Sequence, residues 1–281
     1  MQDLRLPALS TAHGARWSVD VIEATSRGRL FSASPDRILS TASIGKIFAL
    51  VELASRLDDG RIDPGVRLSR TTVPPVGDSG LWRHLLVDQL PVSDIATLIG
   101  AASDNLATNV LIEALGLVEI QAVASRLAPG GSTLHDIVRD DRGAGHPGML
   151  SSGCARDWAH LFAELHSGQR FTPGERDRVL GWLASGMDLS MASSAFLLDP
   201  LSHDRRDMGV RFFGKTGTDV GVRGEVGVVL GPQSVVAFAA LVNWDPLKDE
   251  AGRGAMLTSL RSIGEFVVRC ARTVRSASST E

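Results

Sequence analysis

Blocks of strand-like and helix-like sequence follow one another along this chain, and their order limits the folds open to it. Apolar residues predict strands near both ends of the chain, at 17–22, 30–33, 210–215, 224–230 and 235–242. Apolar residues at helical spacing predict helices at 43–57, 93–127, 154–167, 173–186 and 251–273. This order predicts an antiparallel sheet built from both chain ends, with a helical block inserted between them.

The predicted fold class is α/β in the α+β sense, with an antiparallel sheet flanked by helices and an inserted all-helical lobe. We expect residues 1–40 and 200–281 to form a discontinuous sheet lobe, and residues 41–199 to form the helical lobe. A length of 281 residues suits one core with two lobes better than two independent domains. An apolar content of 43% is ordinary for a soluble globular protein.

Charge and hydropathy argue against several classes of partner. A net charge of -3 gives no reason to expect a nucleic acid or an anionic membrane. No apolar run approaches the roughly 18 residues that span a bilayer, and the first residues lack the basic and apolar regions of a signal peptide. We therefore expect a cytoplasmic monomer acting on a small molecule, or a secreted one if the natural chain carries a leader that this sequence lacks.

The two cysteines, Cys154 and Cys270, lie in apolar, helix-like surroundings. This favours free buried thiols over a disulfide. The sequence predicts no metal site and no cofactor.

Three short motifs carry the candidate chemistry, and they follow one another about 60 and 110 residues apart. They read Ser43-Ile44-Gly45-Lys46, Ser103-Asp104-Asn105 and Lys215-Thr216-Gly217. The chain has 29 lysines and arginines, but only three are lysines, and two of these three lie in the motifs. Arginine is effectively always protonated, whereas a desolvated lysine can lose its proton. Lysine at these positions therefore indicates an amine that takes part in proton transfer.

The first motif predicts a nucleophile and its base. Ser43 begins a predicted helix, so its hydroxyl lies near the positive end of the helix dipole. Lys46 follows one turn later on the same helix face. Lys46 can take the Ser43 proton if burial or a nearby cation such as Lys215 lowers the pKa of Lys46. The alternative, a helix-capping serine beside an exposed lysine, is disfavoured because the other two motifs are present.

The second motif supplies groups for proton transfer and orientation. Ser103 can pass a proton to a leaving group, and Asn105 can orient Lys46 and donate its amide to a substrate carbonyl. The alternative for Ser103-Asp104-Asn105 is a helix cap.

The third motif ends an apolar strand. Gly217 lets a substrate backbone approach the strand edge, and the backbone N–H groups of Ser43 and Thr218 would form an oxyanion hole. Arg223, on the next strand, can hold a substrate carboxylate in a forked geometry. An ordinary surface arginine is an equally good interpretation of Arg223.

Together with their surroundings, these motifs resemble those of class A serine β-lactamases and penicillin-binding proteins. The likeness extends from about residue 16 to residue 270 and is closest to the cytoplasmic β-lactamase-like serine hydrolases. It also covers the segments 32–36, 60–63, 77–80 and 103–109.

The resemblance implies an acyl-enzyme on Ser43, with proton transfer through Lys46 and Ser103. It also implies a carboxylate site formed by Lys215, Thr216 and Arg223.

One departure from the family pattern concerns release of the acyl group. Class A enzymes activate water with a glutamate in a loop that follows the second motif, but residues 133–152 contain no glutamate here. Asp136 resembles the acid that anchors this loop in the family. The possible substitutes for the missing base are His135, Asp136, Asp140, Asp141 and His146. The chain also has no tyrosine, which excludes the tyrosine-based chemistry of class C enzymes.

Three functions remain open from the sequence. The first is a serine hydrolase that acts, slowly, on β-lactam amide bonds. The second is a cytoplasmic esterase, amidase or acyltransferase of the same fold with another substrate. The third is a non-catalytic module that binds β-lactams as a sensor. The charged segment 196–208 is a candidate for the mouth of the site.

Overall fold

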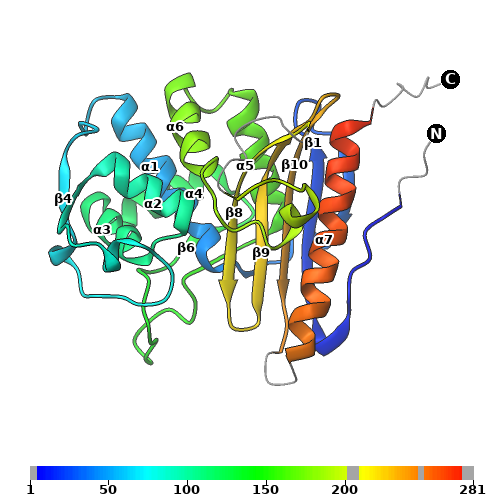
Figure 1. The fold of residues 1–281 in the computed structure, drawn as a ribbon, viewed down its shortest axis with the longest axis horizontal. Helices are drawn as coiled ribbons and strands as arrows, with labels where there is room; N and C mark the ends of the chain where they lie inside the picture. The colour runs from blue at the N-terminus through cyan, green and yellow to red at the C-terminus, as the bar shows by residue number, and fades with distance from the viewer. Residues whose placement is uncertain (1–4, 201–208, 246–249, 274–281) are drawn as a thin grey trace.

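The computed structural model describes residues 5–200, 209–245 and 250–273 (Figure 1). Its main sheet has five strands, ordered β2-β1-β10-β9-β8, and every neighbouring pair is antiparallel. The strands come from both ends of the chain: β1 (Arg16–Glu23), β2 (Arg29–Ala33), β8 (Arg211–Asp219), β9 (Val222–Leu230) and β10 (Val235–Asn243). The predicted fold class is confirmed.

Helices cover both faces of the sheet, which explains why its central strands are apolar throughout. Helix α7 (Glu250–Arg272) and the short 3₁₀ helix η5 (Ala192–Ala195) pack on one face, and α5 (Ala155–Ser167) packs on the other. Alternate residues of β10 belong to the two apolar clusters that result, as the two-residue period of a strand requires.

The helical lobe lies beside the β8 edge of the sheet (Figure 1). Helix α1 (Lys46–Asp58) runs through its centre, and every side chain from Lys46 to Ala54 is buried. The helices around α1 are α2 (Val92–Ala102), α3 (Asn105–Leu115), α4 (Leu117–Leu127) and α6 (Pro173–Leu183). The run predicted at 93–127 is thus three helices, broken at the second motif and at Gly116.

Short elements that the sequence did not reveal connect the lobes. Strands β3 (Leu39–Ser40), β7 (Ser151–Gly153) and β6 (Thr133–Leu134) form a small sheet, and β4 (Arg67–Ser69) pairs with β5 (Gln89–Pro91). The 3₁₀ helices outside the site are η1 (Ala12–Gly14), η3 (Arg70–Thr72) and η4 (Trp82–His84). Segments of two to four residues are too short to show a hydrophobic period.

The predicted lobe boundaries, 1–40 with 200–281 and 41–199, stay a prediction. Helix α5 falls in the second range but packs on the sheet. Of the segment 196–208, residues 201–208 lie outside the described residues.

Within the described ranges, no single helix is long and apolar enough to cross a membrane. The pair α3 and α4 reaches that length and composition only when taken together, and it bends by 93° at its break. The same ranges hold no group of three or more His, Cys, Asp or Glu residues that could bind a metal ion. Cys154 and Cys270 are both buried and neither forms a disulfide, as predicted.

Candidate active site

Ser43 lies in a tightly packed 3₁₀ turn, η2 (Ala42–Gly45), directly before α1. Ala42 has a left-handed backbone with φ 47°, a strained conformation that its surroundings must enforce. Ser151 of β7 does so: its Oγ donates to Ala42 O at 2.6 Å and lies 2.7 Å from Thr41 Oγ1. A Cβ on Gly45 would collide with the same serine, which requires glycine there. Packing therefore fixes Ser43 at the N-terminus of α1.

The Lys46 side chain is fully buried and reaches the second motif. Its Nζ lies 2.6 Å from Ser103 O, 2.7 Å from Asn105 Oδ1 and 3.4 Å from Ser103 Oγ. Burial, reinforced by the charge of Lys215, holds the pKa of Lys46 well below its ordinary value. Among the described residues Lys46 makes no hydrogen bond to Ser43. Such bonds often form only when substrate is present.

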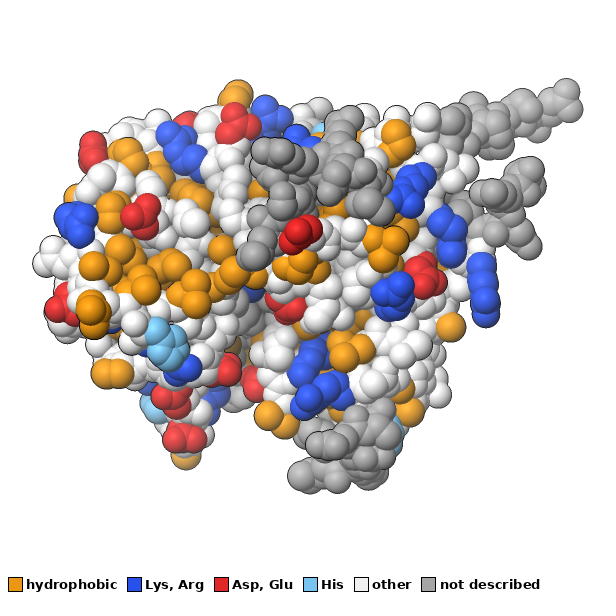
Figure 2. Space-filling view, in the orientation of Figure 1, with side chains coloured by type: hydrophobic (Ala, Val, Ile, Leu, Met, Phe, Trp, Pro, Cys, Tyr) orange, Lys and Arg blue, Asp and Glu red, His pale blue; other side chains and the backbone are white. Residues whose placement is uncertain are grey.

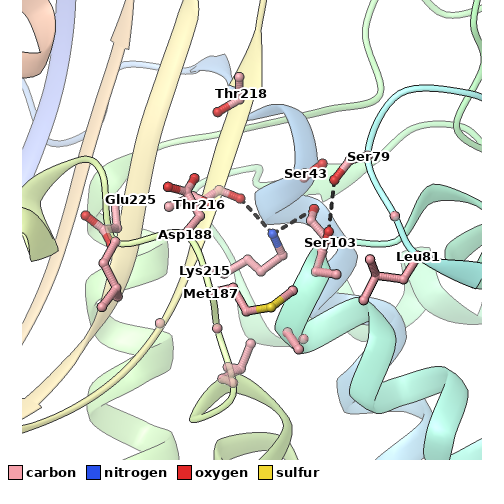
Figure 3. Close-up of a pocket in the computed structure, with 18 of the residues that line it drawn as sticks. Ser43, Ser79, Leu81, Ser103, Met187, Asp188, Lys215, Thr216, Thr218 and Glu225 are labelled. Atoms are coloured by element: carbon pink, nitrogen blue, oxygen red, sulfur yellow. Dashed lines mark hydrogen bonds between the residues drawn. The ribbon is translucent and has the colours of Figure 1, made fainter. Parts of the chain in front are cut away.

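Ser103 lies between the two motif lysines, at the break between α2 and α3. Its backbone is left-handed, with φ 54° and ψ 33°. Its hydroxyl accepts a hydrogen bond from Lys215 Nζ at 2.9 Å (Figure 3). The same hydroxyl lies 3.4 Å from Lys46 Nζ. Lys215 is also buried, and this burial lowers the pKa of Lys215 to about 8. Both lysines therefore meet at a single hydroxyl.

Asn105 is tied to the loop that precedes η4. Its Nδ2 donates to Gly77 O at 3.0 Å, and its backbone N–H donates to Ser79 O at 3.0 Å. Asp104 holds the same loop, because it accepts a hydrogen bond from Leu81 N–H at 2.7 Å. The sequence assigned the Asn105 amide to a substrate carbonyl. Since Gly77 takes one of its two N–H groups, only the other can serve that role.

Strand β8 forms the open edge of the sheet beside Ser43 (Figure 1). A two-residue turn joins β8 to β9, so the pair Asp219–Val222 shares ladder hydrogen bonds. Hydrogen-bonded and non-hydrogen-bonded pairs alternate along the ladder, so the backbone N–H and C=O groups of Thr216 and Thr218 point to the open edge. The hydrogen bond from Lys215 Nζ to Thr216 O, at 2.9 Å, agrees with this alternation. The Thr218 N–H is thus directed to the cleft.

Gly217 packs against the turn that carries Ser43. A Cβ at this position would collide with Thr41 O and come within 3.0 Å of Ile44 Cγ1. The structure gives this glycine a packing role, and the predicted room for a substrate backbone stays a prediction.

Two adjoining cavities share Ser43, Asp78 and Thr218. We call the first, of about 640 Å³, the acidic half; its lining includes Ser103, Asp188, Lys215, Thr216 and Glu225. We call the second, of about 600 Å³, the arginine half; its lining includes Asn105, Val138, Arg139, Asp140, Arg142, Arg223 and Arg253. Figure 2 shows basic side chains gathered beside the β8–β9 hairpin on this face.

Arg223 lies in the arginine half, apart from Lys215 and Thr216. Its Nη1 donates to Asp219 O at 2.8 Å, and its guanidinium carbon lies 5.8 Å from the centre of the Trp244 ring. The resemblance implied one carboxylate site formed by all three residues. Arg223 lies opposite Thr218, which both halves share, and the implied carboxylate site stays a prediction.

Of the candidate bases in the loop after β6, only Asp140 lines the cleft. Its Oδ1 accepts a hydrogen bond from Gly77 N–H at 2.8 Å. Asp136 instead binds Arg139 and Arg142, each at 2.8 Å. Burial alone would raise the pKa of Asp136, but these hydrogen bonds outweigh it and lower the pKa. Asp136 therefore anchors the loop. Neither half of the cleft is lined by Asp136, His135, Asp141 or His146.

Asn109 holds the backbone of Val138 at both of its polar groups. Val138 N–H donates to Asn109 Oδ1 at 2.8 Å, and Asn109 Nδ2 donates to Val138 O at 2.9 Å. Val138 lines the arginine half, as Ser43 does. At this point of the loop the cleft is therefore lined by an apolar residue and not by a carboxylate.

Four acidic residues line the cleft although no motif in the sequence singled them out: Asp78, Asp188, Asp219 and Glu225. Glu225 did carry a signal, because it is a lone carboxylate in a strand that is otherwise apolar. Asp78 has a left-handed backbone with φ 59°, which sequence does not reveal. Asp188 follows α6 in a loop and has no distinguishing pattern.

This fold, with its serine and lysine motifs meeting at one cleft, defines the class of serine enzymes to which β-lactamases and penicillin-binding proteins belong. A β-lactamase from Sphaerobacter thermophilus is 22% identical, with a TM-score of 0.78 over 93% of each chain. A PBP-A mutant in an acyl-enzyme complex with penicillin G is 22% identical, with a TM-score of 0.76 over 93% of this chain and 92% of that one.

A β-lactamase from Xanthomonas campestris is 15% identical, with a TM-score of 0.74 over 92% of each chain. No curated protein sequence gives a significant match. The model of the Beta-lactamase enzyme family matches residues 4–258, and the chain belongs to this family. It is a serine β-lactamase-like hydrolase.

Proposed function

We propose that this protein forms an acyl-enzyme on Ser43 with β-lactams and hydrolyses it slowly. The observation that carries the proposal is the Ser103 hydroxyl, which lies 2.9 Å from Lys215 Nζ and 3.4 Å from Lys46 Nζ. This arrangement supports a path for protons between a nucleophile and a leaving nitrogen.

Acylation uses Lys46 as the base. As Ser43 Oγ bonds to the carbonyl carbon, its proton moves to Lys46 Nζ, whose depressed pKa makes the neutral amine available. The negative charge on the carbonyl oxygen is stabilised by the backbone N–H groups of Ser43 and Thr218. Asn105 and the Ser103 carbonyl hold the amine in place.

Collapse of the tetrahedral intermediate breaks the carbon–nitrogen bond. The leaving nitrogen takes the proton of Ser103 Oγ, and Ser103 regains one from Lys46, which returns to its neutral form. The net transfer is one proton from Ser43 to the leaving nitrogen. Lys215 remains protonated below its pKa of about 8 and offsets the negative charge that builds up at Ser103.

Deacylation lacks a well-placed base. Val138 faces the cleft where a carboxylate would be needed, and Asp140, the only candidate of the loop that lines the cleft, accepts a hydrogen bond from Gly77 N–H. We therefore propose an acyl-enzyme that accumulates. A cytoplasmic location, a monomeric state and the absence of nucleic-acid or membrane partners stay predictions.

A second candidate is hydrolysis of a different amide or ester. It is favoured by two carboxylates, Asp188 and Glu225, which line the half of the cleft that also holds Lys215 and Thr216. These two carboxylates would partly repel a substrate whose only charged group in this half of the cleft is a carboxylate. If the acyl-enzyme never turns over, the protein serves as a β-lactam-binding sensor instead.

Intact-mass spectrometry tests these proposals directly. We expect benzylpenicillin to add its full mass once to the wild-type protein, with slow recovery of the free mass. Ser43→Ala is the control and should gain nothing. A panel of activated esters, run in parallel, identifies the second candidate if esters label Ser43 and penicillin does not. Equal labelling of both proteins by penicillin would contradict the nucleophile assignment.

A further inference from the structure

The acidic half contains a buried carboxylate that the acylation steps do not use. Glu225 of β9 lies opposite Thr216 of β8, so both side chains project from the same face of the sheet. Glu225 is 0% exposed to solvent and yet lines the cavity. Its Oε2 accepts a hydrogen bond from Ser193 N–H at 2.8 Å, whereas its Oε1 has no partner. A buried carboxylate charge of this kind is costly unless a nearby positive charge offsets it.

Asp188 places a second carboxylate on the same cavity. It is exposed, and its Oδ1 accepts hydrogen bonds from Ser190 N–H at 3.1 Å and Ser190 Oγ at 2.6 Å. Asp188, Glu225 and Thr216 lie on the same side of Lys215 in Figure 3. Burial raises the pKa of Glu225 to about 7, and the charge of Asp188 adds to the rise.

Lys215 does not supply the missing partner. Its Nζ donates to Ser103 Oγ and Thr216 O, each at 2.9 Å. Glu225 Oε1 has no hydrogen bond to it. Two carboxylates thus lie near one lysine that is already engaged by the catalytic motifs. A cation from outside the protein would complement this excess of negative charge.

We propose that the acidic half binds a cationic group of the substrate, next to the carboxylate that Lys215 and Thr216 receive. The proposal rests on the proposed function and defines its substrate class as one that is zwitterionic on the leaving-group side. The arginine half is less favourable for the same cation, because its four arginines outnumber its three aspartates, whereas in the acidic half three carboxylates face one lysine.

Two cephalosporins provide matched probes. Cephaloridine and cephalothin share one acyl side chain and one ring carboxylate, but the group beside that carboxylate is a pyridinium in the first and an acetoxy group in the second. We would measure the dissociation constants of both by calorimetry with Ser43→Ala, which binds them without reacting. The pH is kept above the Glu225 pKa of about 7, so that the carboxylate is ionised.

We expect cephaloridine to bind on the order of tenfold more tightly than cephalothin, a ratio equivalent to about 1.4 kcal/mol. Adding Glu225→Gln or Asp188→Asn should reduce this preference towards one. Asp219→Asn is the matched control, because it removes a negative charge from the arginine half of the same cleft and should keep the preference. Asp188 is exposed, so its variant does not depend on refolding of a buried site.

Equal affinities for the two compounds would overturn the proposal. A preference that survives both acidic-half variants, or no binding of either compound at millimolar concentration, would overturn it as well. Failure of the proposed function has a different signature. In that case neither compound labels Ser43 in the wild-type protein, while the ratio of dissociation constants still reports on the cationic site.

Discussion

The two halves of the cleft share Ser43 but differ in charge and in how they are built. The acidic half contains groups held by helices and strands, among them Ser103 at the end of α2 and Lys215, Thr216 and Glu225 on β8 and β9. Much of the arginine half comes from the loop after β6 and the β8–β9 turn. Regular elements therefore hold the acylation groups, while in the proposed function release of the acyl group depends on a loop.

The largest effect is expected at the residue that the two halves share. Ser43→Ala should abolish covalent labelling by a penicillin or a fluorophosphonate, because no other hydroxyl begins α1 beside the buried amine. Intact mass measures labelling, and thermal unfolding checks that the fold is kept. Labelling of Ser43→Ala would show that Ser43 is not the nucleophile, and the two halves of the cleft would then share no catalytic residue.

The next largest effect is expected at the base, Lys46, which is buried behind the cleft and contacts Ser103 of the acidic half. Lys46→Arg removes the amine that accepts the Ser43 proton and should slow acylation by the ~10² to 10⁴ typical of general-base loss. Stopped-flow acylation rates with a penicillin measure this. Near-normal acylation in Lys46→Arg would show that another group is the base.

One substitution in the arginine half should raise the rate of deacylation. Val138→Glu places a carboxylate at the position that Asn109 fixes, and we expect deacylation about 10²-fold faster, at the low end of general-base effects. Val138→Gln is the control, because it has the same size without the base. Mass-spectrometric decay of the acyl-enzyme gives both rates. Equal decay in the two variants would mean that this position does not face the attacking water.

A smaller effect is expected from pH. The pKa of Lys215 is lowered to about 8 from an ordinary value of 10.5, so the amine is protonated below that pH and neutral above it. Acylation by substrates with a carboxylate should therefore fall as pH rises through this pKa, by at most about tenfold per unit. Lys215→Arg should be slower throughout, because the larger head does not fit the buried site, and should lose this alkaline limb, because guanidinium stays charged. If the acylation rate of Lys215→Arg still falls at high pH, a group other than Lys215 causes the fall.

The smallest effects are expected in the loop itself. Asp136→Asn loses charged hydrogen bonds from Arg139 and Arg142 and should lower stability by about 1–2 kcal/mol. It should leave the chemistry of deacylation unchanged once the protein is folded.

Asp140→Asn should do the reverse, with little loss of stability and a slower residual deacylation. Asp141→Asn should affect neither. Thermal unfolding and acyl-enzyme decay measure the two properties separately, and slower decay in Asp136→Asn alone would contradict the anchor role.

The sequence by itself determined the elements and their chemistry. Hydrophobic period located the five long strands and the seven helices of the described residues to within a few residues, although it merged three of the helices. The start of α6 is also encoded locally, because Thr172 and Glu175 form a capping box there. The three motifs named the serines and lysines that meet in the cleft. These features are local, because each depends on residues within a few positions of one another.

Only the tertiary structure decided how these groups share the cleft. Arg223 and Glu225 are two residues apart on one strand, yet the hairpin turn, Trp244 and η5 direct them to opposite halves. Val138 lines the same half of the cleft as Ser43 because Asn109, 29 positions earlier in the sequence, holds its backbone. Burial lowers the pKa values of Lys46 and Lys215, and burial is created by segments from both ends of the chain. Such contacts cannot be predicted from a local sequence pattern, because they form between residues that only the fold brings together.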